Sequence, residues 1–183
     1  MKTIWIVMLT ASCLVTAQST KVPPHLVGEP TAMYAREGEV LKDAPPEDIA
    51  VARNYAHFAN KGTLFVGKRI TIMTAKTTYR VGEEVRVIHI LEAPGPGHQL
   101  FVMGPKGIWD EIVDGRNVMP YEEKLRAYNG MVDQSPGVDF NFEVTTYTFT
   151  TPGVHTIQWR GTGLWSYENP PPTSNILNIT VVQ

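Results

Sequence analysis

The sequence predicts an all-β protein, an antiparallel β-sandwich with an N-terminal arm and one short helix packed on it. Three observations predict this fold. Apolar and polar side chains alternate in several short segments after residue 62, turn sequences separate these segments, and no helical period alternates with them as it would in a parallel α/β protein. We therefore expect a signal peptide at 1–17, an arm and helix at 18–62, and a sandwich at 63–183.

The N-terminus has the features of a signal peptide. Lys2 precedes an apolar stretch at 4–15, and the small residues of Val15-Thr16-Ala17 predict cleavage before Gln18. Lipidation at Cys13 is the alternative, but Thr10 stands where a lipoprotein signal has a large aliphatic residue. The apolar stretch is shorter than the roughly 20 residues of a membrane span, so we expect no transmembrane segment and a secreted or periplasmic, cell-envelope location.

Charge and cysteine content exclude some classes of protein. The chain has 16 Lys and Arg against 18 Asp and Glu, a net charge of −2, and its basic residues are scattered. We therefore expect no nucleic-acid partner, because binding to phosphates requires a basic stripe. The only cysteine, Cys13, lies in the expected signal peptide, so the hydrophobic core must hold the exported protein together without a disulfide.

The segment 46–59 predicts the single helix, after an arm rich in Pro, Gly and charge. Pro46 suits the first helical position, Glu47 and Asp48 favour the positive end of the helix dipole, and Gly62 follows the end. Arg53, Asn54 and His57 are expected to face solvent. The opposite apolar face consists of Val51, Ala52, Tyr55, Phe58 and Ala59.

From Thr63 the hydrophobic period changes to two, which indicates strands. We expect them within 63–76, 84–93, 98–104, 108–113, 116–121, 138–149, 154–160 and 175–182. Asp114-Gly115 predicts a two-residue type I′ hairpin. In 138–149, Val138, Phe140, Phe142 and Val144 share one expected face and Asp139, Asn141 and Glu143 the other. Trp159 is assigned to the core, as are Leu177, Ile179 and Val181.

Three segments carry a fold-level resemblance. "YRVGEEVRV", "FTTPGVHTIQWR" and "SNILNITVV" are similar to immunoglobulin-like sandwich modules of exported bacterial proteins, including the macroglobulin-type ones. The resemblance covers about 63–183 and implies an immunoglobulin-like sandwich without a specific function. Immunoglobulin domains have a Gly-x-Tyr-x-Cys run, whose tyrosine forms a corner hydrogen bond. Here His155 stands in the place of the tyrosine and Ile157 in that of the cysteine.

Segment 84–93 indicates where the helix packs. Val85, Val87, His89 and Leu91 occupy one face, yet Ile88 and Ile90 on the other face are also large and apolar. Because both faces of this strand are apolar, we expect the 46–59 helix to cover the second one. The alternative is that the arm and helix add to a neighbouring subunit and form a homo-oligomer through strand addition.

A soft metal site is one candidate for the chemistry. His89, His98, Met103 and His155 are the residue types that bind copper, provided that they converge. The competing interpretation is that His89 and His155 are core residues bonded to backbone, and that His25 and His57 are solvated. No two histidines have the i, i+2 or i, i+4 spacing of a local metal motif, so we expect no cofactor, with copper as the alternative.

Catalytic groups are not indicated. Asp110, Glu111 and Asp114 are close in sequence, but Asp110 and Glu111 point to opposite faces of a strand and Asp114 lies in the turn. We expect all three to be solvated hairpin charges. No serine lies in a Gly-x-Ser-x-Gly elbow and no phosphate-binding loop is present, so an enzyme is not the favoured interpretation.

A long loop at 160–175 is the strongest binding candidate. It begins at Arg160 and places Trp165 and Tyr167 among Gly and Pro, and long loops on rigid sandwiches carry binding function. Trp109 lies near a turn and is a further candidate. The alternative for Trp165 is a lid over the edge of the core. The sequence thus predicts an exported, non-catalytic binding or assembly module that recognises a protein or glycan through these residues, with a copper-binding accessory protein as the alternative.

Overall fold

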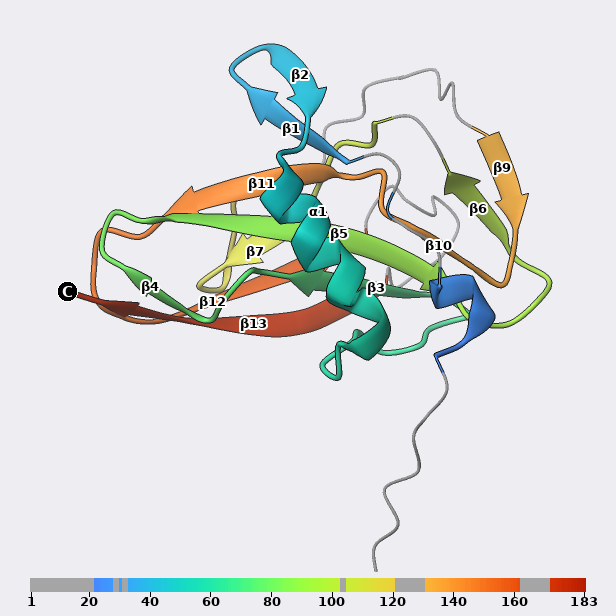
Figure 1. Ribbon diagram of the computed structural model, residues 1–183. Coiled ribbons are helices and arrows are strands. Elements are labelled where there is room, and N and C mark those ends of the chain that lie inside the picture. Colours follow the sequence, from blue (N-terminus) through green and yellow to red (C-terminus); the bar gives the residue numbers. More distant parts are fainter. Residues whose placement is uncertain (1–21, 28–29, 31–32, 103–104, 121–130, 162–171) are drawn as a thin grey trace, which may run out of the picture.

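The computed structural model describes residues 22–27, 30, 33–102, 105–120, 131–161 and 172–183. Strands dominate, and they form two mixed sheets with one short α-helix on the outer face of the first (Figure 1). A short 3₁₀ helix, η1 (Pro24–Leu26), precedes the strands.

The first sheet is built around β5 (Glu84–Ala93), which is its longest strand. Its central strand β5 pairs with β3, β10 and β11, and β11 continues through β1 to β2. The bounds are β1 (Tyr34–Glu37), β2 (Val40–Asp43), β3 (Arg69–Met73), β5 (Glu84–Ala93), β10 (Gly137–Asp139) and β11 (Glu143–Thr148). The β1–β2 hairpin projects from the rest of the sheet (Figure 1).

The second sheet has the order β4-β13-β12-β7-β8, and a separate ribbon pairs β6 with β9. The bounds are β4 (Thr78–Arg80), β7 (Glu111–Val113), β8 (Arg116–Asn117), β12 (Gly153–Arg160), β13 (Thr173–Val182), β6 (Gln99–Val102) and β9 (Met131–Gln134). The β7–β8 hairpin confirms the predicted turn, because Asp114 and Gly115 both have positive φ, 48° and 77°.

The expectation of a wholly antiparallel arrangement is wrong at two places. β1 runs parallel to β11, with Tyr34 opposite Glu143, and β4 runs parallel to β13, with Thr180 opposite Thr78. Both pairings join segments that are far apart in the sequence, so no hairpin fixes their direction. Alternation of side chains predicts the face that each residue takes and says nothing about the direction of the neighbouring strand.

The main core lies between the two sheets. Val85, Val87 and Leu91 of β5 pack in one buried cluster with residues of the second sheet, including Ile157 and Trp159. Trp159 is 1% exposed, which confirms its assignment to the core. The inward residues predicted for β13 are also confirmed: Leu177, Ile179 and Val181.

The predicted helix is shorter than expected, and it does cover the second face of β5. Helix α1 (Pro46–Arg53) ends where a 3₁₀ turn, η2 (Asn54–His57), begins. Ala52 and Tyr55 are buried in one cluster with Ile88 and Ile90, so the predicted packing is confirmed. Arg53, Asn54 and His57 are exposed as expected, whereas Ala59 is exposed and not part of the apolar face.

The expected single strand at 138–149 is interrupted. β10 pairs Asp139 with Leu91 and β11 pairs Thr145 with Val87, so the five residues between Asp139 and Thr145 lie opposite only three residues of β5. The backbone of Lys106 pairs with the segment between β10 and β11. Its N–H donates to the Asn141 carbonyl, and its C=O accepts from the Glu143 amide. Phe142 therefore joins the inter-sheet core, while Val138, Phe140 and Val144 pack in the cluster that contains the helix. The predicted common face is wrong for Phe142.

Candidate functional site

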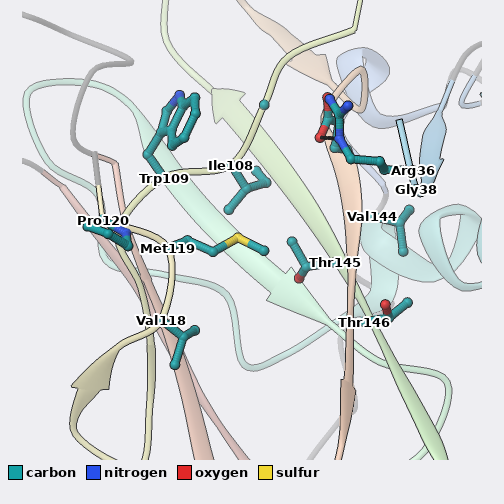
Figure 2. A pocket seen from close by; sticks show the side chains of 12 residues that line it. Arg36, Gly38, Ile108, Trp109, Val118, Met119, Pro120, Val144, Thr145 and Thr146 are labelled. Atoms are coloured by element: carbon teal, nitrogen blue, oxygen red, sulfur yellow. Dashed lines mark hydrogen bonds and ion pairs between the residues drawn. The ribbon is translucent and has the colours of Figure 1, made fainter. Parts of the chain in front are cut away.

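A hollow of about 490 Å³ lies beside β11, and Trp109 is one of its lining residues (Figure 2). It lies where strand β11 of the first sheet approaches the chain before β7 and after β8. Ile108 and Met119 contribute apolar surface, while Thr145 and Thr146 come from β11. In Figure 2, Trp109 and Arg36 stand on opposite sides of this hollow, with Met119 and Thr145 between them.

The chain turns sharply next to Trp109. Asp110 has a φ of 55°, in the left-handed region that Asp adopts more readily than most residues. Its side chain accepts a hydrogen bond of 2.7 Å from Asn117 Nδ2, which holds the turn. The turn separates Trp109, which is partly exposed at the hollow, from Glu111, which is buried in the core.

An ion pair forms one end of the hollow. Arg36 of β1 donates to Glu143 of β11 through Nε at 3.3 Å and through the second guanidinium nitrogen at 2.6 Å. Hydrogen bonding to Glu143, and then its charge, raises the pKa of Arg36. These two charges neutralise each other, and the other described lining residues carry no charge.

Behind the hollow lies a buried polar network centred on Glu111. The Glu111 carboxylate bonds to His89 Nε2 at 3.0 Å and accepts from Thr145 Oγ1 at 2.7 Å and from the Tyr147 hydroxyl at 2.5 Å. Trp159 packs edge-on against the His89 ring at 5.0 Å. The expectation that Glu111 is a solvated charge is therefore wrong.

The network stabilises a buried charge. Burial alone opposes ionisation of Glu111, but His89 and the two hydroxyl donors outweigh that effect and lower the pKa of the carboxyl group. Burial, and then the Glu111 carboxylate, raises the pKa of Tyr147. His89 is a core histidine as expected, but its partner is a carboxylate and not the backbone.

His155 occupies a different site, on the middle strand β12 of the second sheet and next to the β7–β8 turn. Its Nδ1 donates to Asp114 Oδ2 at 2.7 Å, and its Nε2 donates to the Thr151 carbonyl at 3.0 Å. Phe149 stacks on the imidazole at 4.2 Å. His155 thus bonds to backbone four residues upstream, as the tyrosine of a tyrosine corner does. Hydrogen bonding to Asp114 and Thr151 raises the pKa of His155.

The structure does not bring the three candidate histidine ligands together. His89 lies in the core with Glu111, and His155 bonds to Asp114 and Thr151. His98 directly precedes β6, and its backbone amide donates to Ser135 Oγ. Met103 lies outside the described residues. Over the described part of the chain, no group of three His, Cys, Asp or Glu side chains could hold a metal ion.

A second buried network, which the sequence analysis missed, attaches the arm and helix to β5. Glu92 accepts hydrogen bonds from Tyr55 at 2.7 Å and Arg69 at 2.6 Å, and its other oxygen bonds to His25 at 2.9 Å. His25 was expected to be solvated, but its side chain is mostly buried against Glu92. Despite burial of Glu92, these three partners together lower its pKa.

Of the four predicted binding residues, the structure describes Arg160 and Trp109. Trp165 and Tyr167 lie outside the described residues. Arg160 is exposed at the end of β12, and its amide donates to the Asp110 carbonyl at 3.1 Å. Of the two candidates that the structure describes, Arg160 and Trp109, only Trp109 lines the hollow. Thr145 and Arg36 were missed, because only the fold places them opposite Trp109.

Comparison of the chain with protein-family models, with curated proteins and with solved structures found no match. Within the described residues, no helix has the length and apolar character needed to span a membrane.

Proposed function

We propose that this protein is an exported, immunoglobulin-like module that binds a protein or glycan partner without catalysis, in the hollow beside Trp109. The observation that supports this most directly is the hollow itself, because it combines a partly exposed tryptophan with uncharged lining and a few polar groups. Such concave sites with an aromatic anchor are typical of binding. The corner hydrogen bond of His155 supports the immunoglobulin-like assignment.

The geometry favours binding over catalysis at this site. The ionisable side chains of the lining, Arg36 and Glu143, are bonded to each other. The buried carboxylate of Glu111 lies behind Thr145 and accepts hydrogen bonds from Thr145 and Tyr147. A general acid and base need two titratable groups directed at one substrate, and this hollow presents a satisfied ion pair instead.

A Trp109→Ala variant tests the proposal. The full exported chain and the variant are compared on arrays of oligosaccharides and extended peptides, with Phe65→Ala as a control because Phe65 is a partly buried aromatic residue on another turn. We expect Trp109→Ala to weaken binding at least tenfold, as loss of an aromatic anchor does, and Phe65→Ala to retain it. Equal binding by Trp109→Ala and the wild type would reject the proposed site.

A further inference from the structure

The edge of β11 is open beside the hollow. β1 pairs only with the first two residues of β11, Glu143 and Val144, whereas Thr145–Thr148 pair with β5 on the opposite edge. No strand among the described residues pairs with the outer edge of Thr145–Thr148. In a β-ladder alternate residues direct their N–H and C=O groups to one side, so within the described part of the chain no strand pairs with the groups that this edge presents.

Several other sheet edges carry features that prevent strand addition. On β3, the Asn175 side chain bonds to both backbone groups of Ile72, accepting from N–H at 2.8 Å and donating to C=O at 2.9 Å. The edge strand β2 carries the exposed charges of Lys42 and Asp43, and β4 and β8 are only three and two residues long. Charged, capped and short edges are the usual protection against pairing with another chain.

The open edge of β11 has none of these features. The sequence Thr145-Thr146-Tyr147-Thr148 is uncharged, contains no proline and consists of residues that favour strands. Thr145 and Thr146 also line the hollow. An added strand would therefore lie in this hollow, in line with β1 and beyond its pairing with Val144.

We propose that the open edge of β11 binds an extended, uncharged segment of a partner protein by strand addition, with apolar side chains at alternate positions directed into the Trp109 hollow. This inference rests on the proposed function and names its ligand. Four residues of edge extend about 13 Å, which suits a short extended segment. Ile108, Met119 and Trp109 provide the apolar contacts.

The surroundings of the edge favour a peptide segment over the sheet of a second copy. The hollow is bounded by Gly38 of the β1–β2 hairpin and by Val118–Pro120 across from β11. These segments flank the edge, so a single strand has access where a complete sheet would collide with them. The neutral Arg36–Glu143 pair offers no net charge to attract a charged segment.

A synthetic peptide in which threonine and valine alternate between two terminal lysines provides the probe. Two matched controls carry N-methyl groups, one on every threonine and the other on every valine. Strand addition uses one edge of the peptide, so one methylated isomer should bind at least tenfold more weakly than the parent while the other retains its affinity. Equal affinities of all three peptides would overturn strand addition.

Amide hydrogen exchange of the full chain locates the bound peptide. We expect the outward-facing amides within Thr145–Thr148 to exchange at least tenfold more slowly with the peptide, while those of Val40–Asp43 on β2 stay unchanged. Thr146→Lys should weaken binding tenfold, and Thr180→Lys, at an equally exposed threonine of β13, should not. Protection at β2, or a dimer of the wild type that protects the same β11 amides, would overturn the inference.

The outcome also separates this inference from the proposed function. Loss of oligosaccharide binding by Trp109→Ala, together with peptide binding that is insensitive to methylation, would leave the hollow as a binding site and reject strand addition. Selective loss of binding by one methylated isomer, with unchanged affinity in Trp109→Ala, would support the open edge and reject the aromatic anchor.

Discussion

Glu111 of β7 and His89 of β5 join the two sheets through a hydrogen bond of 3.0 Å between side chains that are both fully buried. The bond crosses the core directly behind the hollow, since Thr145 both lines the hollow and donates to Glu111. The position of the two sheets around the candidate site therefore depends on this polar network.

We expect Glu111→Leu to lower the free energy of unfolding by about 3–5 kcal/mol, because it leaves His89, Thr145 and Tyr147 buried without their acceptor. His89→Leu with Glu111→Leu should cost less than the sum of the two single variants, since the double variant removes both partners. Urea denaturation measures all three. Additive effects would show that the pair is not coupled.

The bonding of His155 predicts a pH dependence. Both acceptors, the Asp114 carboxylate and the Thr151 carbonyl, favour the protonated imidazole, and the pKa of His155 is raised from 6.5. Stabilisation from a raised pKa is fully present below the unfolded value of 6.5 and is lost as pH rises through the folded pKa. NMR titration of the ring nitrogens should give a pKa above 6.5 in the wild type.

Asp114→Asn supplies the control for that titration. Asparagine suits the type I′ turn and still accepts from Thr156, but it removes the charge beside His155. Burial opposes ionisation of Asp114, whereas His155 and Thr156 lower its pKa below 3.8, so its contribution is lost only in stronger acid. We expect the variant to be less stable than the wild type at pH 5–6, with a smaller difference at pH 9. A pH-independent difference would contradict this account.

Tyr55→Phe tests the attachment of the helix to β5. The change removes the hydrogen bond to Glu92, a buried carboxylate, and should lower stability by about 1.5–3 kcal/mol. His57→Ala changes an exposed residue of the same 3₁₀ turn and should stay within about 0.5 kcal/mol of the wild type. Thermal unfolding measures the stability of both variants. Similar losses of stability would mean that the Tyr55 hydroxyl does not contribute to the stability of the fold.

Asn175→Ala tests the cap on β3. Loss of the amide leaves the Ile72 N–H and C=O groups buried without partners, so we expect a cost of about 2–4 kcal/mol. Asn178→Ala, at an exposed position of the same strand, is the matched control. Wild-type stability in Asn175→Ala, measured by chemical denaturation, would show that water replaces the cap.

Local patterns in the sequence predicted the parts of the fold that depend on neighbouring residues. Ile88 and Ile90 indicated a covered second face of β5, and Asp114-Gly115 indicated the hairpin, because each signal lies within a few residues. Glu111 was misassigned for the opposite reason. Its partners His89, Thr145 and Tyr147 lie 22 to 36 residues away, and nothing in its own segment indicates that the fold brings them to it.

The candidate site was predicted only through Trp109. Arg36 and Thr145 also line the hollow, and they lie close to each other because β1 pairs in parallel with β11. No hairpin sequence predicts this pairing. The parallel direction arises from tertiary packing, and side-chain alternation carries no information about it.

Fluorine NMR of the chain labelled with 5-fluorotryptophan tests the central claim, that ligands bind beside Trp109, most directly. Trp109→Phe assigns the Trp109 resonance, and Trp159, which is buried in the core and donates from Nε1 to the Trp109 carbonyl at 3.1 Å, provides a comparison. On titration with the alternating peptide and with oligosaccharides, we predict a saturable shift of the Trp109 resonance with at least one ligand, and a smaller shift of the Trp159 resonance. An unchanged Trp109 resonance in the presence of a ligand that shifts other tryptophans would contradict the account.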